Sequence, residues 1–114
     1  MDFETLTKDI FSIDPKIRFV TIVDSKGKVV HSVHREGVTS SLNKRESKKS
    51  LKQIVKFWTT NKDFSSKFGK GHYSITVYEK VKRIVFSMDS KKILYITTEP
   101  EADHDAIIKQ LTKL

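Results

Sequence analysis

Residues 18–34 read RFVTIVDSKGKVVHSVH, and the fold of the chain depends on this stretch. Two runs rich in Val, Ile, Phe and Thr are joined by the polar segment Asp24–Gly27, a composition that predicts a β-hairpin. Gly27 can supply the turn position with positive φ that such a hairpin needs. The hairpin therefore provides the first two strands of a sheet.

The first strand of the hairpin is apolar on both faces, because side chains alternate in direction along a strand. One set is Ile17, Phe19 and Val23, and the other set is Val20 and Ile22. A strand covered on both faces lies inside a sheet that has helices on each side. The remaining segments must supply those helices and the neighbouring strands.

The segments outside the hairpin show the periodicities of further helices and strands. The first helix ends before Asp14, because Pro15 disfavours a helical residue before it. Phe64 and Phe68 are four apart and predict a last helical turn that packs down onto the protein. The predicted elements are a helix over 2–13, a loop over 35–46, a helix from about residue 47, a connector over 61–71, strands over 72–79, 81–88 and 92–98, and a closing helix that opens at 99–101.

This order, α-β-β-α-β-β-β-α, predicts an α+β fold with one five-stranded antiparallel sheet. We expect the two terminal helices on one face and the central helix on the other. A chain of 114 residues has the size of one ordinary domain, so residues 1–114 should form a single domain. Bulky residues at the inward positions Phe19, Ile22, Phe86 and Ile96 favour a filled core.

The chain is basic: it carries 22 Lys and Arg against 14 Asp and Glu, a net charge of +8. Such an excess favours an anionic partner, whether nucleic acid, anionic lipid or an acidic protein surface. There are no cysteines, so disulfides and thiolate chemistry are excluded. The N-terminus lacks the pattern of a signal peptide and no apolar run is as long as a membrane span, so we expect a cytoplasmic protein.

The element order resembles that of the roadblock family, which includes dynein light chain and GTPase-regulator domains. Two segments carry the resemblance. They are IRFVTIVDSKGKVV over residues 17–30, a strand-turn-strand with an Asp in the turn, and ILYITTEPEADHDAIIKQL over residues 93–111, a strand that runs through a Pro-containing corner into the closing helix. The chain is also similar to small archaeal proteins of unassigned function with an EPEADH-type ending. Profilin-like and PAS-like folds share the central sheet and are the competing assignments.

The resemblance implies a non-enzymatic domain that dimerises through the central helix and the adjoining edge strand. It also implies a platform for a small GTPase or another protein partner. On that basis we expect a homodimer whose interface includes apolar residues of the central helix and the third strand. These residues are Leu51, Ile54, Phe57, Trp58, Tyr73 and Ile75. The alternative is that Phe57 and Trp58 pack on the protein's own sheet.

One flank of the central helix is basic, because five cationic side chains fall together at about 100° per residue. These residues, the basic stripe, are Arg45, Lys48, Lys49, Lys52 and Lys56. The stripe is either a solvated surface or a binding site for anions or an acidic partner. Binding to nucleic acid would weaken steeply with salt. If two central helices packed antiparallel, the stripe would have to stay at the rim, because like charges repel.

The sequence contains no catalytic or metal-binding motif. Its serines lack a nucleophile elbow, and residues 69–71 lack the glycine spacing of a phosphate-binding loop. His31 and His34 are three apart on a strand, so they should point to opposite faces and cannot bind one ion together. We therefore expect no enzyme, no metal site and no cofactor.

Three classes of function remain. The resemblance favours a dimeric interaction module that acts as a scaffold or regulator of a small GTPase or a similar signalling partner. The second class is a PAS-like small-molecule sensor, which needs a cavity between helix and sheet. The third is a basic nucleic-acid-binding domain.

Overall fold

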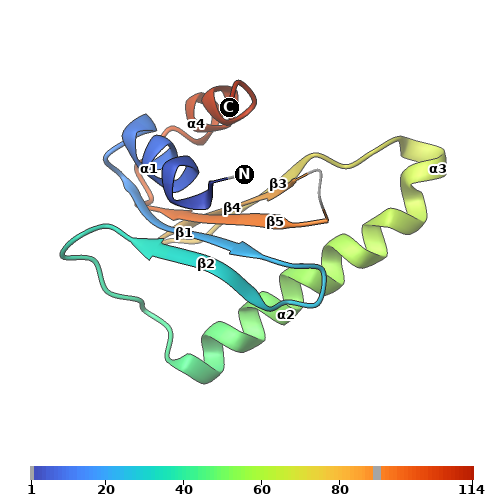
Figure 1. Cartoon of the computed structure of the whole chain (residues 1–114), viewed down its shortest axis with the longest axis horizontal. Coiled ribbons are helices and arrows are strands. Elements are labelled where there is room, and N and C mark those ends of the chain that lie inside the picture. The colour runs from blue at the N-terminus through green and yellow to red at the C-terminus, as the bar shows by residue number, and fades with distance from the viewer. Residues whose placement is uncertain (1, 89–90) are drawn as a thin grey trace.

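One five-stranded sheet forms the centre of the computed structural model, which describes residues 2–88 and 91–114. The strand order is β2-β1-β5-β4-β3, and every neighbouring pair is antiparallel (Figure 1). The elements are α1 (Phe3–Ile13), β1 (Ile17–Val23), β2 (Val29–His34), α2 (Lys44–Asn61), the 3-10 helix η1 (Lys62–Phe64), α3 (Ser65–Phe68), β3 (Tyr73–Val77), β4 (Lys82–Ser87), β5 (Ile93–Thr98) and α4 (His104–Leu111). The predicted α+β class and element order are confirmed. The turn predicted at residues 89–90 lies outside the described residues.

Helices cover both faces of the sheet. The terminal helices α1 and α4 lie together over one face, and α2 crosses the other (Figure 1). The larger core cluster lies under α1 and α4 and includes the fully buried Val20, Ile22 and Ile84. A smaller cluster on the α2 side joins Val23 of β1 to Ile54 of α2. The predicted placement of the helices is therefore confirmed, and β1 is buried on both faces.

Ile17 lies on a different face of the sheet from the one predicted. It packs with Val20 and Ile22 in the cluster under α1 and α4, and not with Val23 on the α2 side. The pairing of β1 with β5 shifts register between Ile17 and Phe19. An irregularity of this kind interrupts the alternation of side chains, so strict alternation leads to the wrong face for Ile17.

The turn between β1 and β2 is held by Asp24. The carboxylate of Asp24 accepts hydrogen bonds from the backbone N–H groups of Lys28 at 3.0 Å and Lys26 at 2.9 Å. These hydrogen bonds, that of Lys28 first, hold the pKa of Asp24 below its usual range. Gly27 has a φ of 86°, which confirms the predicted turn position.

The helix α2 begins earlier than its apolar periodicity predicts. Asn43 and Glu46 form a capping box before and within its first turn. The side chain of Asn43 accepts the N–H of Glu46 at 2.8 Å, and the side chain of Glu46 accepts the N–H of Asn43 at 3.0 Å. The loop predicted over 35–46 is therefore shorter, because its last residues belong to the helix.

The closing helix α4 begins later than predicted. The side chain of Asp103 accepts the N–H of Ala106 at 3.1 Å and caps the helix at its first residue, His104. The expected opening at residues 99–101 is wrong, because these residues form a turn in which the N–H of Ala102 donates to the carbonyl of Glu99 at 3.2 Å.

Candidate functional site

The inner face of α2 is occupied by the protein's own sheet. Ile54 and Trp58 are buried there against side chains of β1, β4 and β5, and Trp58 is only 7% exposed. Leu51 is half-buried at the edge of the same cluster. These three residues of the predicted interface are therefore covered within one copy of the chain.

Phe57 lies on the flank of α2 that faces β4, the neighbour of the edge strand β3 in the sheet. Ser50, two turns earlier on the same flank, is 3.4 Å from a guanidinium nitrogen of Arg83 on β4. Val55, on the opposite flank, lies beside Gly27 in the β1–β2 turn. Phe57 is 53% exposed and meets the ring of Trp58 edge-on at 5.7 Å between centroids. A large apolar side chain is thus left uncovered beside the edge of the sheet.

The neighbouring edge strand β3 also exposes apolar side chains. Tyr73, Val77 and the adjacent Tyr78 are exposed, and the sheet order shows no strand beyond β3 among the described residues. Tyr73 stacks on Phe86 of β4 at 5.5 Å on the sheet face opposite α2. The predicted interface residue Ile75 lies on that same face and is half-buried against the core under α1 and α4. The structure therefore separates Tyr73 and Ile75 from Leu51, Ile54 and Trp58 by the thickness of the sheet.

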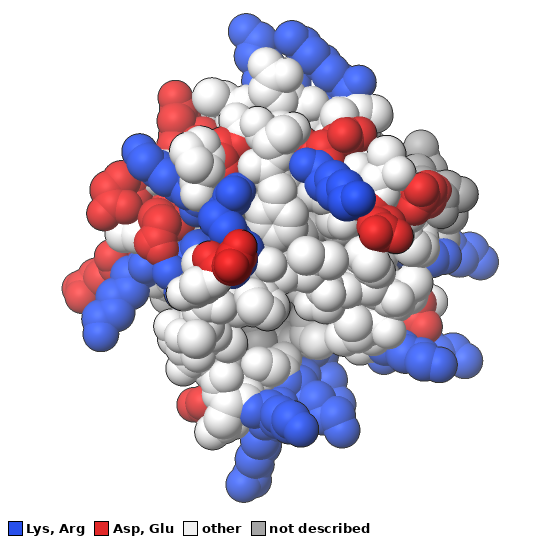
Figure 2. All heavy atoms as spheres, turned by 60° about the vertical axis from the view of Figure 1, so that its left-hand side comes forward, with Lys and Arg blue, Asp and Glu red and all other residues white. Residues whose placement is uncertain are grey.

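All five residues of the basic stripe lie on α2 and are solvent-accessible. At helical spacing they lie on the side of α2 opposite Ile54, which faces the sheet. Among the described residues, none of the five forms an ion pair, and the one acidic residue of α2, Glu46, is used in the capping box. Figure 2 shows Lys and Arg side chains gathered at the lower end of the molecule, where α2 begins.

Two further aromatic residues lie beyond the end of α2. Phe64 and Phe68 lie on η1 and α3, which confirms the predicted helical turn. The expectation that they pack down is wrong: both are exposed, and their rings stack on each other at 5.9 Å. The helical turn ends at Gly69, whose φ is 85°.

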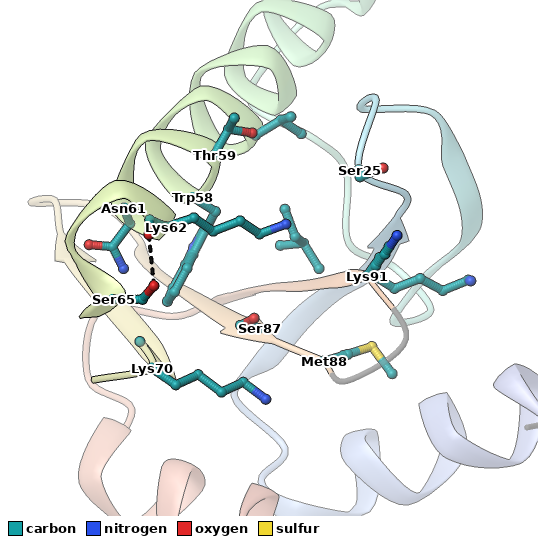
Figure 3. A pocket seen from close by; sticks show the side chains of 14 residues that line it. Ser25, Trp58, Thr59, Asn61, Lys62, Ser65, Lys70, Ser87, Met88 and Lys91 are labelled. Carbon is teal, nitrogen blue, oxygen red and sulfur yellow. Dashed lines mark hydrogen bonds between the residues drawn. The ribbon is translucent and has the colours of Figure 1, made fainter. Parts of the chain in front are cut away.

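A cavity of about 380 Å³ lies at the C-terminal end of α2, next to the β1–β2 turn and the adjoining ends of β4 and β5 (Figure 3). Its apolar wall includes Val55, Trp58 and Ile93. Gly71 approaches the indole so closely that a Cβ there would lie 2.9 Å from a ring carbon of Trp58. The lining also includes four lysines and several hydroxyl and amide groups. The lysines are Lys62, Lys70, Lys91 and Lys92.

Sequence reasoning does not find this cavity. Residues 69–71 suggest only a comparison with phosphate-binding loops, and Lys92 falls at the start of a predicted strand. The cavity forms because the chain after α3 returns past Trp58, a packing that no local pattern encodes.

The histidines occupy separate environments. His31 lies beside α1, with Nε2 3.5 Å from the hydroxyl of Thr7, and His34 packs on the ring of Phe19. The described part of the chain contains no group of three side chains able to hold a metal ion. No helix in that part is both long and apolar enough to cross a membrane.

The fold is that of a roadblock-like domain. A roadblock/LC7 domain from Streptomyces avermitilis has a TM-score of 0.70 at 13% identity, over 94% of this chain and 86% of that chain. The gliding protein MglB from Thermus thermophilus has a TM-score of 0.78 at 8% identity, over 96% and 80%. A structure described as MglB with tetrameric arrangement has a TM-score of 0.76 at 10% identity, over 97% and 82%.

The chain belongs to DUF6659, a family of unknown function, whose sequence model matches residues 1–114. No curated protein matches the sequence.

Proposed function

We propose that this protein is a non-enzymatic, homodimeric interaction module that acts as a scaffold or regulator of a small GTPase or a similar signalling partner. Phe57 carries the proposal, because an exposed phenyl ring near an edge strand that pairs with no further strand of the described chain is the kind of surface that a second copy would cover. The roadblock-like fold supports a role in protein interaction. One solved neighbour, MglB, is described in a tetrameric arrangement, which is a self-association of that protein.

A dimer formed in this way uses the flank of α2 that carries Phe57 and the edge of β3. The basic stripe lies on the outer side of α2 and stays at the rim of such an interface, where water screens the like charges. The stripe then remains available to a partner with an acidic surface.

Solution mass tests the dimer. Light scattering and sedimentation across a concentration series should give twice the 13.2 kDa of one chain. The Phe57→Ser variant should weaken self-association by about tenfold or more, because buried aromatic residues contribute most at such interfaces.

The matched control is Val30→Ser on the opposite edge strand β2, where the side chain is 41% exposed and belongs to neither surface. This variant should keep the mass of the wild type. A monomer at every concentration, or equal weakening by both substitutions, would overturn the proposed dimer.

The partner is tested with a small GTPase from the same genome, loaded in turn with GDP and with a GTP analogue. The double variant Lys48→Glu, Lys52→Glu should weaken binding and leave the solution mass unchanged. If the stripe instead binds labelled oligonucleotides with a steep salt dependence, and no GTPase binds, it serves nucleic acid.

A further inference from the structure

We propose that the cavity at the C-terminal end of α2 binds a small molecule that carries phosphate groups. This inference goes beyond the proposed interaction role and does not depend on dimerisation. It rests on the charge, the hydrogen-bonding groups and the shape of the cavity.

The charged side chains among the described lining residues are all cations. Lys62 comes from η1, whereas Lys91 and Lys92 come from the segment that leads into β5, so cations from distant parts of the chain meet around one concave surface. In Figure 3 the side chain of Lys62 extends over the cavity from the side of α2, and Lys91 lies across from it. No carboxylate is found among the described lining residues, and none of these three ammonium groups pairs with a described acid. A concave surface with this charge focuses a positive potential on an anion.

The neutral lining groups suit the several oxygens of a phosphate. The hydroxyl groups of Ser25, Thr59 and Ser87 and the amide of Asn61 line the cavity. Hydroxyl, amide and ammonium groups can all donate to anionic oxygen, and charge-assisted hydrogen bonds of this kind are the stronger class. A phosphate chain offers more acceptor oxygens than one carboxylate, so it can use donors from several walls at once.

The size and backbone of the cavity also fit a ligand. Its volume of about 380 Å³ lies within the range of small-molecule sites, and Val55, Trp58 and Ile93 supply an apolar wall. Lys91 has a φ of 61°, a left-handed conformation that is uncommon for a residue with a side chain. Such conformations cluster at ligand-holding positions.

The basic stripe on α2 differs from this cavity in its shape. Its five side chains lie on one convex helix surface and face solvent, so an anion there is held only by screened charge. The lysines of the stripe have the same charge as those of the cavity but lie on an open surface. Substitutions in the stripe are therefore a control for substitutions in the cavity.

The chain contains one tryptophan, Trp58, and it lines the cavity, so its fluorescence reports on occupancy. Inorganic tripolyphosphate should change the emission of Trp58 along a saturable curve, and calorimetry should give the same affinity. ATP should bind as well, and adenosine, which lacks phosphate, should not. An affinity for ATP well above that for tripolyphosphate assigns the ligand to nucleotides, and equal affinities assign it to the phosphate chain alone.

The double variant Lys62→Ala, Lys92→Ala should weaken tripolyphosphate binding by about tenfold or more. The control Lys48→Ala, Lys52→Ala removes the same charge from the basic stripe and should bind as the wild type does. Circular dichroism should show the same fold for both variants. The absence of saturable binding, or equal weakening by both double variants, would overturn the proposal. A monomeric solution mass would overturn the proposed dimer and leave this site standing.

Discussion

Arg35 joins three segments of the molecule at a single residue. Its Nε donates to the carbonyl of Ile17 at 2.8 Å, and one terminal nitrogen donates to the carbonyls of Phe11 at 2.9 Å and Asp14 at 3.0 Å. The guanidinium also lies 5.0 Å from the centroid of the Phe11 ring. The end of α1 and the start of β1 are therefore tied to the residue that follows β2.

Replacing Arg35 with Lys should destabilise the protein by about 1–3 kcal/mol, because one ammonium group cannot reproduce a planar fork with three carbonyl acceptors. Urea unfolding measures the loss. Arg45→Lys, an exposed change on the basic stripe, should stay within about 0.5 kcal/mol of the wild type. If the two variants unfold at the same urea concentration, the hydrogen bonds of Arg35 contribute nothing net.

At the scale of the element, the start of α2 depends on two side chains that the apolar periodicity ignores. The capping box of Asn43 and Glu46 satisfies N–H groups that the first turn of a helix leaves free. It also directs the chain from the loop after β2 into the helix that carries Phe57 and the basic stripe.

Asn43→Ala should cost about 1 kcal/mol of stability, the usual effect of losing such a cap. Thermal unfolding measures it. Ser41→Ala, in the same loop and exposed, is the control and should leave the midpoint unchanged. A midpoint for Asn43→Ala equal to that of Ser41→Ala would show that the cap does not limit the stability of the domain.

The elements could be predicted because their signals are local. The apolar run of β1, the apolar alternation in β3 to β5 and Gly27 in the turn are enough to predict the sheet, and Pro15 marks the end of α1. The helix caps, Asn43 with Glu46 before α2 and Asp103 before α4, are also local, but they are polar and the apolar periodicity does not reveal them. The face of Ile17 could not be predicted, because it follows from a register shift against a strand far along the chain.

The candidate site can be predicted only in part, because it too depends on contacts between segments that are distant in sequence. The exposure of the basic stripe follows from helical spacing alone. Which of Phe57 and Trp58 is covered depends on how α2 lies on the sheet, and the cavity depends on where the chain returns after α3. Contacts of this kind join residues distant in sequence, and no pattern in one segment encodes them.

At the scale of the whole molecule, the two faces of one sheet pack against two separate hydrophobic clusters. The cluster under α1 and α4 and the cluster under α2 share the strands β1, β4 and β5. A substitution that destabilises one cluster should therefore also lower the stability of the other.

Ile107→Ala in α4 should lower stability by about 2–5 kcal/mol, because the side chain is 1% exposed and its removal leaves a cavity. Trp58 lies on the opposite side of the sheet, so its fluorescence should shift to the same lower urea midpoint as the circular dichroism signal. The exposed Leu114→Ala is the control. An unchanged Trp58 transition beside a shifted circular dichroism transition would mean that the two layers unfold separately.

Because α1 and α4 lie together on one face of the sheet, their packing also determines where a tag or linker can be attached to the protein. Both ends of the described chain lie on the sheet face opposite α2 (Figure 1). An affinity tag, a fluorophore or a surface linker attached at either end projects away from α2 and its lysines. A fusion of two copies through a flexible tether between these ends would leave the α2 surface unobstructed.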